Sequence, residues 1–230
     1  MGRTRIAYFD VDGTLTTGTS LFQFLDYYLT ATGQPPQTYQ QARQKLKAMT
    51  AMGVSREETN RSYFDNLAGA HAADVADLAR EWFQAELSQS GYFNPYTVKA
   101  LFEHQAAGHM TVLVSGSFPA LLKPIATHLG IDETWCTAPE ISQGRYTGRL
   151  AAPPMIGRRK ADAVRTSASV HQADLGECTA YGDHVSDLPM LETTGHAVVV
   201  GGDDDLRKTA QARGWLLLPF ATLETAPLQK

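Results

Sequence analysis

Cysteine is scarce in this sequence, and its scarcity excludes two classes of protein. Among 230 residues only Cys136 and Cys178 are cysteines, and they lie 42 positions apart. This spacing provides neither a CxxC metal pair nor the dense pattern of a secreted disulfide scaffold. The sequence therefore predicts a reducing, cytoplasmic setting.

Long apolar runs and an excess of positive charge are also absent. The longest apolar runs are short stretches such as Val198–Val200 and Trp215–Leu218, whereas a membrane span needs about 20 residues. Near the N-terminus, Asp10 and Asp12 interrupt the apolar segment too early for a signal peptide. The formal net charge is -4, so we expect no broad basic surface. We therefore expect neither a membrane nor a nucleic acid as partner.

Short apolar runs that end in polar or turn residues recur along the chain and predict buried strands. Helical patterns of about 10–15 residues alternate with these runs, which indicates a parallel sheet with right-handed crossovers. The expected strands are Ile6–Phe9, Met110–Val114, Glu177–Tyr181, Ala197–Val200 and Trp215–Leu218. The expected helices that alternate with them are Phe118–Leu129, Arg158–Val170 and Asp203–Arg213.

The stretch between residues 20 and 108 contains no convincing strand. Its apolar residues recur at helical spacing, and the breaks at Gly33–Pro36, Gly53 and Gly69 divide it into about four helices. Asn94 begins a further helix that could rejoin the sheet.

The pattern therefore predicts two parts. Residues 1–18 and 95–230 would form a catalytic core, and residues 19–94 an inserted helical cap. Ile141–Arg149, with turn residues between β-formers, predicts a small hairpin.

Polar side chains follow three of the expected strands. Asp10 and Asp12 follow the first, Ser115 the second, and Asp183 and Asp187 the third. Ligands of an open parallel sheet bind outside the carboxyl ends of its strands. Several carboxylates in one place are costly unless a cation neutralises them, and oxygen ligands without His or Cys favour Mg²⁺.

A phosphate ester fits these residue types. A cation and a lysine would neutralise its phosphoryl oxygens, while Ser115 and the backbone N–H groups of the Ser-Gly-Ser turn would donate hydrogen bonds. One carboxylate could attack phosphorus, and a second could act as general acid and base. Rival templates fail, since the chain lacks the GxxxxGK[ST] of a P-loop and the glycine that a nucleophile elbow requires two residues before its serine.

Four ordered motifs resemble those of the haloacid dehalogenase-like superfamily. They are Asp10-Val-Asp-Gly-Thr-Leu-Thr, Val114-Ser-Gly-Ser-Phe, Lys160, and Gly182-Asp-His-Val-Ser-Asp-Leu-Pro-Met. The helical insertion, the spacing of 23 between Lys160 and Asp183, and the segment Gly144–Arg149 are most similar to the phosphoserine phosphatase-like branch, subfamily IB. The resemblance implies a Rossmann-like α/β fold, with a three-layer parallel-sheet core and an inserted α-helical cap.

The resemblance also implies roles for individual residues. Asp10 would be the nucleophile that forms an aspartyl-phosphate, and Asp12 the general acid and base. The phosphate-binding residues would be Thr14, Ser115, Gly116 and Lys160. The Mg²⁺ site would comprise Asp10, Asp12 through its backbone carbonyl, Asp183, and Asp187 as a support. The predicted function is a Mg²⁺-dependent phosphomonoesterase that acts on a small phosphorylated metabolite. The alternatives are a phosphotransferase using the same intermediate and a non-catalytic phosphometabolite-binding protein.

One departure from the branch concerns the substrate. Phosphoserine phosphatases place a glutamate for the substrate ammonium shortly after the first motif, whereas this chain reads Thr16–Ser20 there and has no acid before Asp26. We therefore expect a phosphoserine phosphatase-like enzyme that is not strictly specific for phosphoserine, and the hydroxyl-rich segment suggests a neutral or hydroxylated group near the phosphate. Arg56 or Arg61 could pair with a substrate carboxylate.

Overall fold

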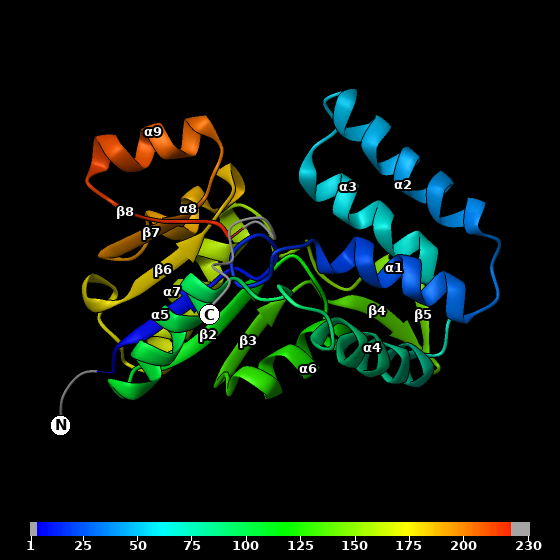
Figure 1. Ribbon diagram of the computed structural model, residues 1–230, viewed down its shortest axis with the longest axis horizontal. Coiled ribbons are helices and arrows are strands. Elements are labelled where there is room, and N and C mark those ends of the chain that lie inside the picture. Colours follow the sequence, from blue (N-terminus) through cyan, green and yellow to red (C-terminus); the bar gives the residue numbers. More distant parts are fainter. Residues whose placement is uncertain (1–3, 222–230) are drawn as a thin grey trace, which may run out of the picture.

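A six-stranded parallel sheet forms the centre of the computed structural model, which describes residues 4–221 (Figure 1). The strand order is β3-β2-β1-β6-β7-β8, and every neighbouring pair is parallel. The strands are β1 (Ile6–Phe9), β2 (Met110–Ser115), β3 (Glu133–Cys136), β6 (Thr179–Gly182), β7 (His196–Val200) and β8 (Leu216–Leu218). The predicted Rossmann-like α/β class is confirmed.

Helices cover both faces of the sheet. Side chains of successive strand residues point to opposite faces, so apolar residues on each face need a layer of helices to bury them. In β1, Ala7 and Phe9 join the buried cluster that includes residues of α5 and α6, whereas Ile6 and Tyr8 join the cluster with α7, α8 and α9. The helices are α5 (Pro95–Ala106), α6 (Pro119–Leu129), α7 (Arg158–Val170), α8 (Leu188–Leu191) and α9 (Asp204–Arg213). The core therefore has three layers.

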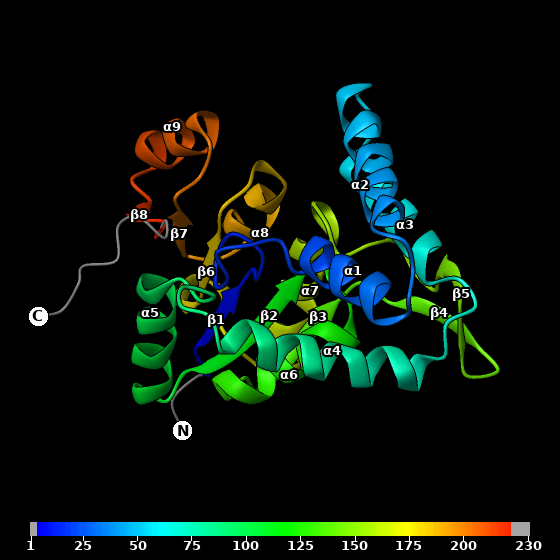
Figure 2. The same cartoon turned by 45° about the vertical axis from the view of Figure 1, so that its right-hand side comes forward.

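The segment between β1 and α5 is helical, as its apolar spacing predicts. Its elements are α1 (Ser20–Ala31), α2 (Pro36–Ala51), α3 (Arg56–Tyr63), the short 3-10 helix η1 (Phe64–Leu67) and α4 (Ala72–Leu87). Helices α2 and α3 rise side by side away from the sheet (Figures 1 and 2). In contrast, α4 packs along α6, and one buried cluster runs from Trp82 and Phe24 to Phe118. The division at residues 18/19 and 94/95 stays a prediction.

Of two shorter elements, the sequence pattern predicts one and misses the other. The predicted hairpin is present as β4 (Pro139–Ser142) and β5 (Arg145–Leu150), and β5 packs against η1. In contrast, β3 escapes the pattern search because its sequence, Glu-Thr-Trp-Cys, is no apolar run. It lies at the edge of the sheet, where its residues are only partly covered.

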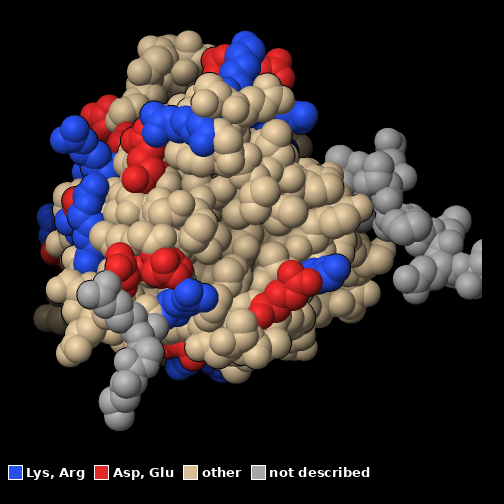
Figure 3. All heavy atoms as spheres, turned by 90° about the vertical axis from the view of Figure 1, so that its left-hand side faces the viewer, with Lys and Arg blue, Asp and Glu red and all other residues tan. Residues whose placement is uncertain are grey.

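The surface shows no concentration of one charge on the face that carries α9. There, Lys and Arg side chains alternate with Asp and Glu (Figure 3).

None of the helices within residues 4–221 combines the length and apolar character that crossing a membrane requires.

Candidate active site

The polar residues expected at the strand ends do come together in space. Strand β1 lies between β2 and β6. The strands that follow β1 in the chain are added first on one side of it (β2, β3) and then on the other (β6, β7, β8), so the strand order reverses there. Asp10 follows β1, Ser115 ends β2, and Asp183 follows β6. These three residues therefore meet at the topological switch point, where ligands of such sheets bind.

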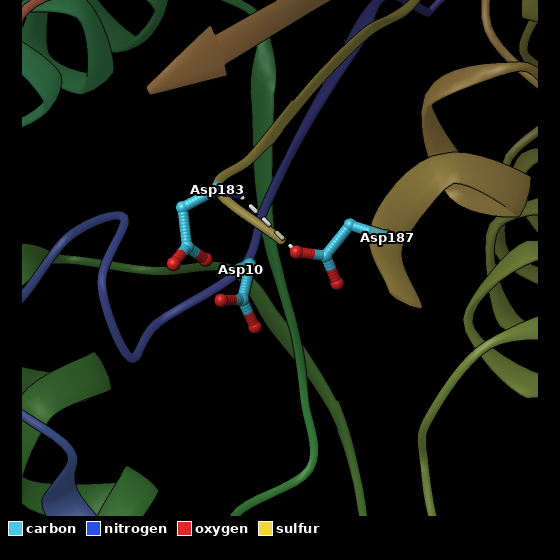
Figure 4. Close-up of side chains that lie close together, drawn as sticks. All are labelled: Asp10, Asp183 and Asp187. Atoms are coloured by element: carbon cyan, nitrogen blue, oxygen red, sulfur yellow. Dashed lines mark hydrogen bonds between the residues drawn. The ribbon is translucent and has the colours of Figure 1, made fainter. Parts of the chain in front are cut away.

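Three carboxylates form a cluster at this point. One carboxylate oxygen from each of Asp10, Asp183 and Asp187 lies within 4.8 Å of the other two, and the three side chains lie close together (Figure 4). Thr14 donates a hydrogen bond from its hydroxyl to Asp183 Oδ1 over 3.3 Å. Burial, followed by the charges of Asp10 and Asp187, raises the pKa of Asp183 to about 8.

Two glycines permit this close approach of the carboxylates. Gly13 has φ +82°, a left-handed conformation that favours glycine, and a Cβ there would overlap the carboxylate of Asp183. A Cβ at Gly182 would lie 2.7 Å from the Cβ of Asp187. The close packing of the carboxylates therefore requires glycine both at position 13 and at position 182.

Lys160 links two of the carboxylates. Its ammonium Nζ donates to Asp10 Oδ1 over 2.6 Å and to Asp187 Oδ1 over 2.7 Å. The lysine is only 3% exposed, whereas its neighbours Arg158 and Arg159 are exposed. Burial lowers the pKa of Lys160, but the charges of Asp10 and Asp187 outweigh this effect, so the pKa lies above its ordinary value.

Asp187 is held in place through both of its oxygens. Its Oδ2 accepts from the backbone N–H groups of Asp183 over 3.3 Å and His184 over 3.2 Å, while Oδ1 accepts from Lys160. Asp187 therefore serves as a fixed negative support between the lysine and the Asp183 loop.

Asp12 lies outside the three-carboxylate cluster. Its Oδ1 accepts from the backbone N–H of Ser20 over 2.9 Å, at the start of α1. Burial, and then the charge of Asp10, raises the pKa of Asp12 to about 6. This carboxyl can therefore exchange a proton near neutral pH, as general acid–base catalysis requires.

The turn after β2 is fixed from several sides. Ser115 is buried, and its Oγ accepts from the backbone N–H of Ser117 over 3.1 Å. The carbonyl oxygen of Gly116 accepts from Asn60 Nδ2 over 3.0 Å and from Thr137 Oγ1 over 2.9 Å. Helix α3 of the insertion thus contacts the Ser-Gly-Ser turn directly.

A cavity of about 120 Å³ lies between this turn and the insertion. Such a volume suits a small ligand, since drug-sized ligands need about 300–1,000 Å³. The residues that line the cavity are Asp10, Asp12, Thr19, Leu21, Phe22, Leu46, Arg56, Thr59, Asn60, Tyr63, Ser115, Gly116, Ile156, Lys160 and Ser186. The sequence predicts no role for Asn60 or Thr59, because no strand end or motif marks them.

Comparison with known proteins identifies the family. The family model described as haloacid dehalogenase-like hydrolase matches residues 7–192. The chain belongs to this family. The match includes all four motifs and the whole helical insertion of this haloacid dehalogenase-like hydrolase.

Relatives and solved structures agree with this assignment. Phosphoserine phosphatase SerB1 of Mycobacterium tuberculosis is 30% identical over 228 residues, covering 94% of this chain and 71% of that protein. A probable phosphatase of the same species is 42% identical over 118 residues, covering 51% of this chain and 41% of that protein. A crystal structure of a protein of unknown function from Bordetella pertussis Tohama I matches with a TM-score of 0.85 and 26% identity, covering 94% of this chain and 99% of that chain.

In the hydroxyl-rich segment Thr16–Ser20 of this haloacid dehalogenase-like hydrolase, the first two threonines bond to backbone carbonyl oxygens. Thr16 Oγ1 donates to the carbonyl oxygens of Val11 and Gly18, and Thr17 Oγ1 donates to that of Gly91. Thr19 is the one member of residues 16–20 among the cavity-lining residues.

Only one of the two cap arginines considered for the substrate lies at the site. Arg56, at the start of α3, lines the cavity. Arg61 is exposed and is not among the lining residues, because it lies on the other side of the same helix.

Proposed function

We propose that this chain is a Mg²⁺-dependent phosphomonoesterase that hydrolyses a small phosphorylated metabolite through an aspartyl-phosphate on Asp10. One observation carries the proposal. The buried Asp10 carboxylate, 6% exposed, belongs to the three-carboxylate cluster, contacts the Lys160 ammonium and lines a small cavity. The phosphatase names of two relatives support the same reaction class.

The donor set fits Mg²⁺. Asp10, Asp183 and Asp187 offer only oxygen atoms, and their charges exceed the single positive charge of Lys160. Hard oxygen donors and an excess of negative charge suit a divalent cation that keeps several waters. Asp10 and Asp183 would hold the ion directly, with the backbone carbonyl of Asp12 as the resemblance implies. Asp187, whose two oxygens already accept hydrogen bonds, would hold its water ligands. When bound, the ion would offset the charge of the phosphoryl oxygens.

The residues of the chain divide the chemistry between them. Asp10 would attack phosphorus, so that a bond forms from its carboxylate oxygen to phosphorus and the bond from phosphorus to the ester oxygen breaks. Asp12 would donate its proton to the departing oxygen. In the second step Asp12 would take a proton from water as that water attacks the phosphorus of the aspartyl-phosphate, which releases phosphate and restores Asp10.

The phosphoryl group would be held by groups on two sides. Lys160 faces Asp10 and can neutralise one phosphoryl oxygen. The N–H groups of the turn at Ser115 and Gly116, which precedes α6, can donate to the others. Thr14 would assist through its bond to Asp183.

Turnover of a generic aryl phosphate tests the proposal. We expect the purified chain to release phosphate from p-nitrophenyl phosphate with Mg²⁺, to lose this activity with EDTA, and to regain it when Mg²⁺ is added in excess. An added alcohol that receives the phosphoryl group in place of water would identify a phosphotransferase. Absence of turnover with every phosphate ester would contradict the proposed reaction.

Mg²⁺ binding should release protons and weaken as the pH falls. In the metal-free protein the pKa of Asp183 is raised to about 8, so near pH 7 this carboxyl is largely protonated, and a protonated carboxyl is no metal ligand. Each displaced proton changes the apparent affinity by about tenfold per pH unit below the pKa. Calorimetric titration at pH 7 in two buffers of different ionisation enthalpy measures the released protons. An affinity that does not change between pH 6 and pH 8 would contradict this coupling.

A further inference from the structure

Two buried polar atoms on α3 lie beside the candidate active site without a hydrogen-bond partner among the described residues. They are Asn60 Oδ1 and the hydroxyl oxygen of Tyr63. Both residues line the cavity that also contains Asp10 and Asp12. Buried polar atoms are rarely left unpaired, because an unpaired atom costs about 1–3 kcal/mol. Two buried polar atoms without hydrogen-bond partners, both on residues that line one cavity, therefore point to a ligand.

The orientation of the Asn60 amide follows from its neighbour. Its Nδ2 lies 3.0 Å from the carbonyl oxygen of Gly116, and a carbonyl oxygen can only accept. The NH₂ end must therefore face Gly116, which leaves Oδ1 as the free end. The residue is only 9% exposed, so this end is directed away from bulk solvent.

Tyr63 lies three residues after Asn60, on the same side of the helix. Its ring packs edge-on against Phe64 with a centroid distance of 5.2 Å, and it is tilted against the ring of Phe118 at a centroid distance of 6.5 Å. The residue is 2% exposed. These contacts fix the ring, and with it the position of the hydroxyl group.

We propose that Asn60 and Tyr63 form a subsite that binds a hydroxyl group on the leaving-group side of the substrate. Asn60 Oδ1 can only accept, so the substrate must donate to it, while a tyrosine hydroxyl can both donate and accept. An alcohol hydroxyl offers both the donor that Asn60 Oδ1 lacks and an acceptor for the tyrosine O–H. This subsite rests on the proposed phosphomonoesterase function and defines its substrates as phosphate monoesters of hydroxylated alcohols.

The charges of the cavity exclude the competing ammonium group. Arg56 and Lys160 contribute positive charges to the lining, and among the described residues the acids there are Asp10 and Asp12, which the proposed reaction itself requires. An ammonium group could donate to Asn60 Oδ1 and to the Tyr63 oxygen, but the hydroxyl proton of Tyr63 would then find no acceptor on it, whereas an alcohol hydroxyl also supplies that acceptor. The proposed subsite agrees with the neutral or hydroxylated group expected from residues 16–20, but it places the recognition on α3.

Three phosphate esters of equal length test the subsite, namely hydroxyethyl, propyl and aminoethyl phosphate. We expect kcat/KM for hydroxyethyl phosphate to exceed that for each of the other two by at least about tenfold. Tyr63→Phe should reduce the ratio of hydroxyethyl to propyl phosphate toward one, because it lowers kcat/KM mainly for the hydroxylated ester. Asn60→Ala should reduce the same ratio and serves as the second variant if Tyr63→Phe does not fold.

Tyr92→Phe is the matched control. Its hydroxyl is also buried and has no hydrogen-bond partner within residues 4–221, but Tyr92 does not line the cavity. This variant should retain the wild-type ratio. A wild-type ratio near one, a preference for aminoethyl phosphate, or an unchanged ratio in a folded Tyr63→Phe protein would overturn the subsite while p-nitrophenyl phosphate is still hydrolysed. Failure of the wild type with all esters, including p-nitrophenyl phosphate, would overturn the proposed function together with the subsite.

Discussion

Asp10→Asn is expected to reduce phosphate release by at least about 10⁴-fold in kcat. The amide has no negative charge and is a poor nucleophile, so the aspartyl-phosphate cannot form. The fold should persist, because the amide oxygen can still accept from Lys160 in place of Asp10 Oδ1. Initial rates of phosphate release from p-nitrophenyl phosphate measure the loss, and circular dichroism measures the fold.

An exposed acid of the insertion provides the control. Asp26 lies on α1, is exposed, and does not line the cavity, so Asp26→Asn should keep the wild-type rate. Mass spectrometry of acid-quenched wild-type protein should detect a phosphoryl group on the peptide that contains Asp10, and none on that peptide of Asp10→Asn. Appreciable turnover by a folded Asp10→Asn protein would assign the nucleophile to another residue.

The sheet was largely predictable because its central strands are buried on both faces and read as apolar runs. Ile6–Phe9 reads as one apolar run, and the structure places all four residues in the interior. The edge strand Glu133–Cys136 has no such run, because an edge position with partial cover places little demand on apolar side chains. An apolar run is thus what made a strand visible, since the other edge strand, Leu216–Leu218, has such a run and was predicted although two of its three residues are exposed.

The acids of the site were predictable for a different reason. A parallel sheet aligns the carboxyl ends of its strands, so Asp10 and Asp183 are neighbours although 173 positions separate them in the chain. No comparable rule predicts the contact between Asn60 and Gly116 from the sequence. It depends on how α3 packs over the turn after β2, and a polar helix such as Arg56–Tyr63 gives little periodic signal of its packed side.

Lys160→Met is expected to lower the free energy of unfolding of the metal-free protein by about 3–5 kcal/mol at pH 8. Methionine has a similar length but no charge, so Asp10 and Asp187 lose the buried cation that both contact. Urea unfolding in EDTA measures the change. Arg159→Met removes an exposed cation next to it and should change the free energy by less than about 0.5 kcal/mol.

The loss in Lys160→Met should depend on pH in a defined direction. Burial already raises the pKa of Asp10, and removal of the lysine charge that opposes this effect raises it further. A carboxyl whose pKa is higher in the folded than in the unfolded state favours folding below the unfolded value, and this contribution is lost as the pH rises toward the folded value. The variant should therefore lose less stability at pH 5 than at pH 8. Equal losses at both pH values would show that Lys160 stabilises the site through packing rather than through its charge.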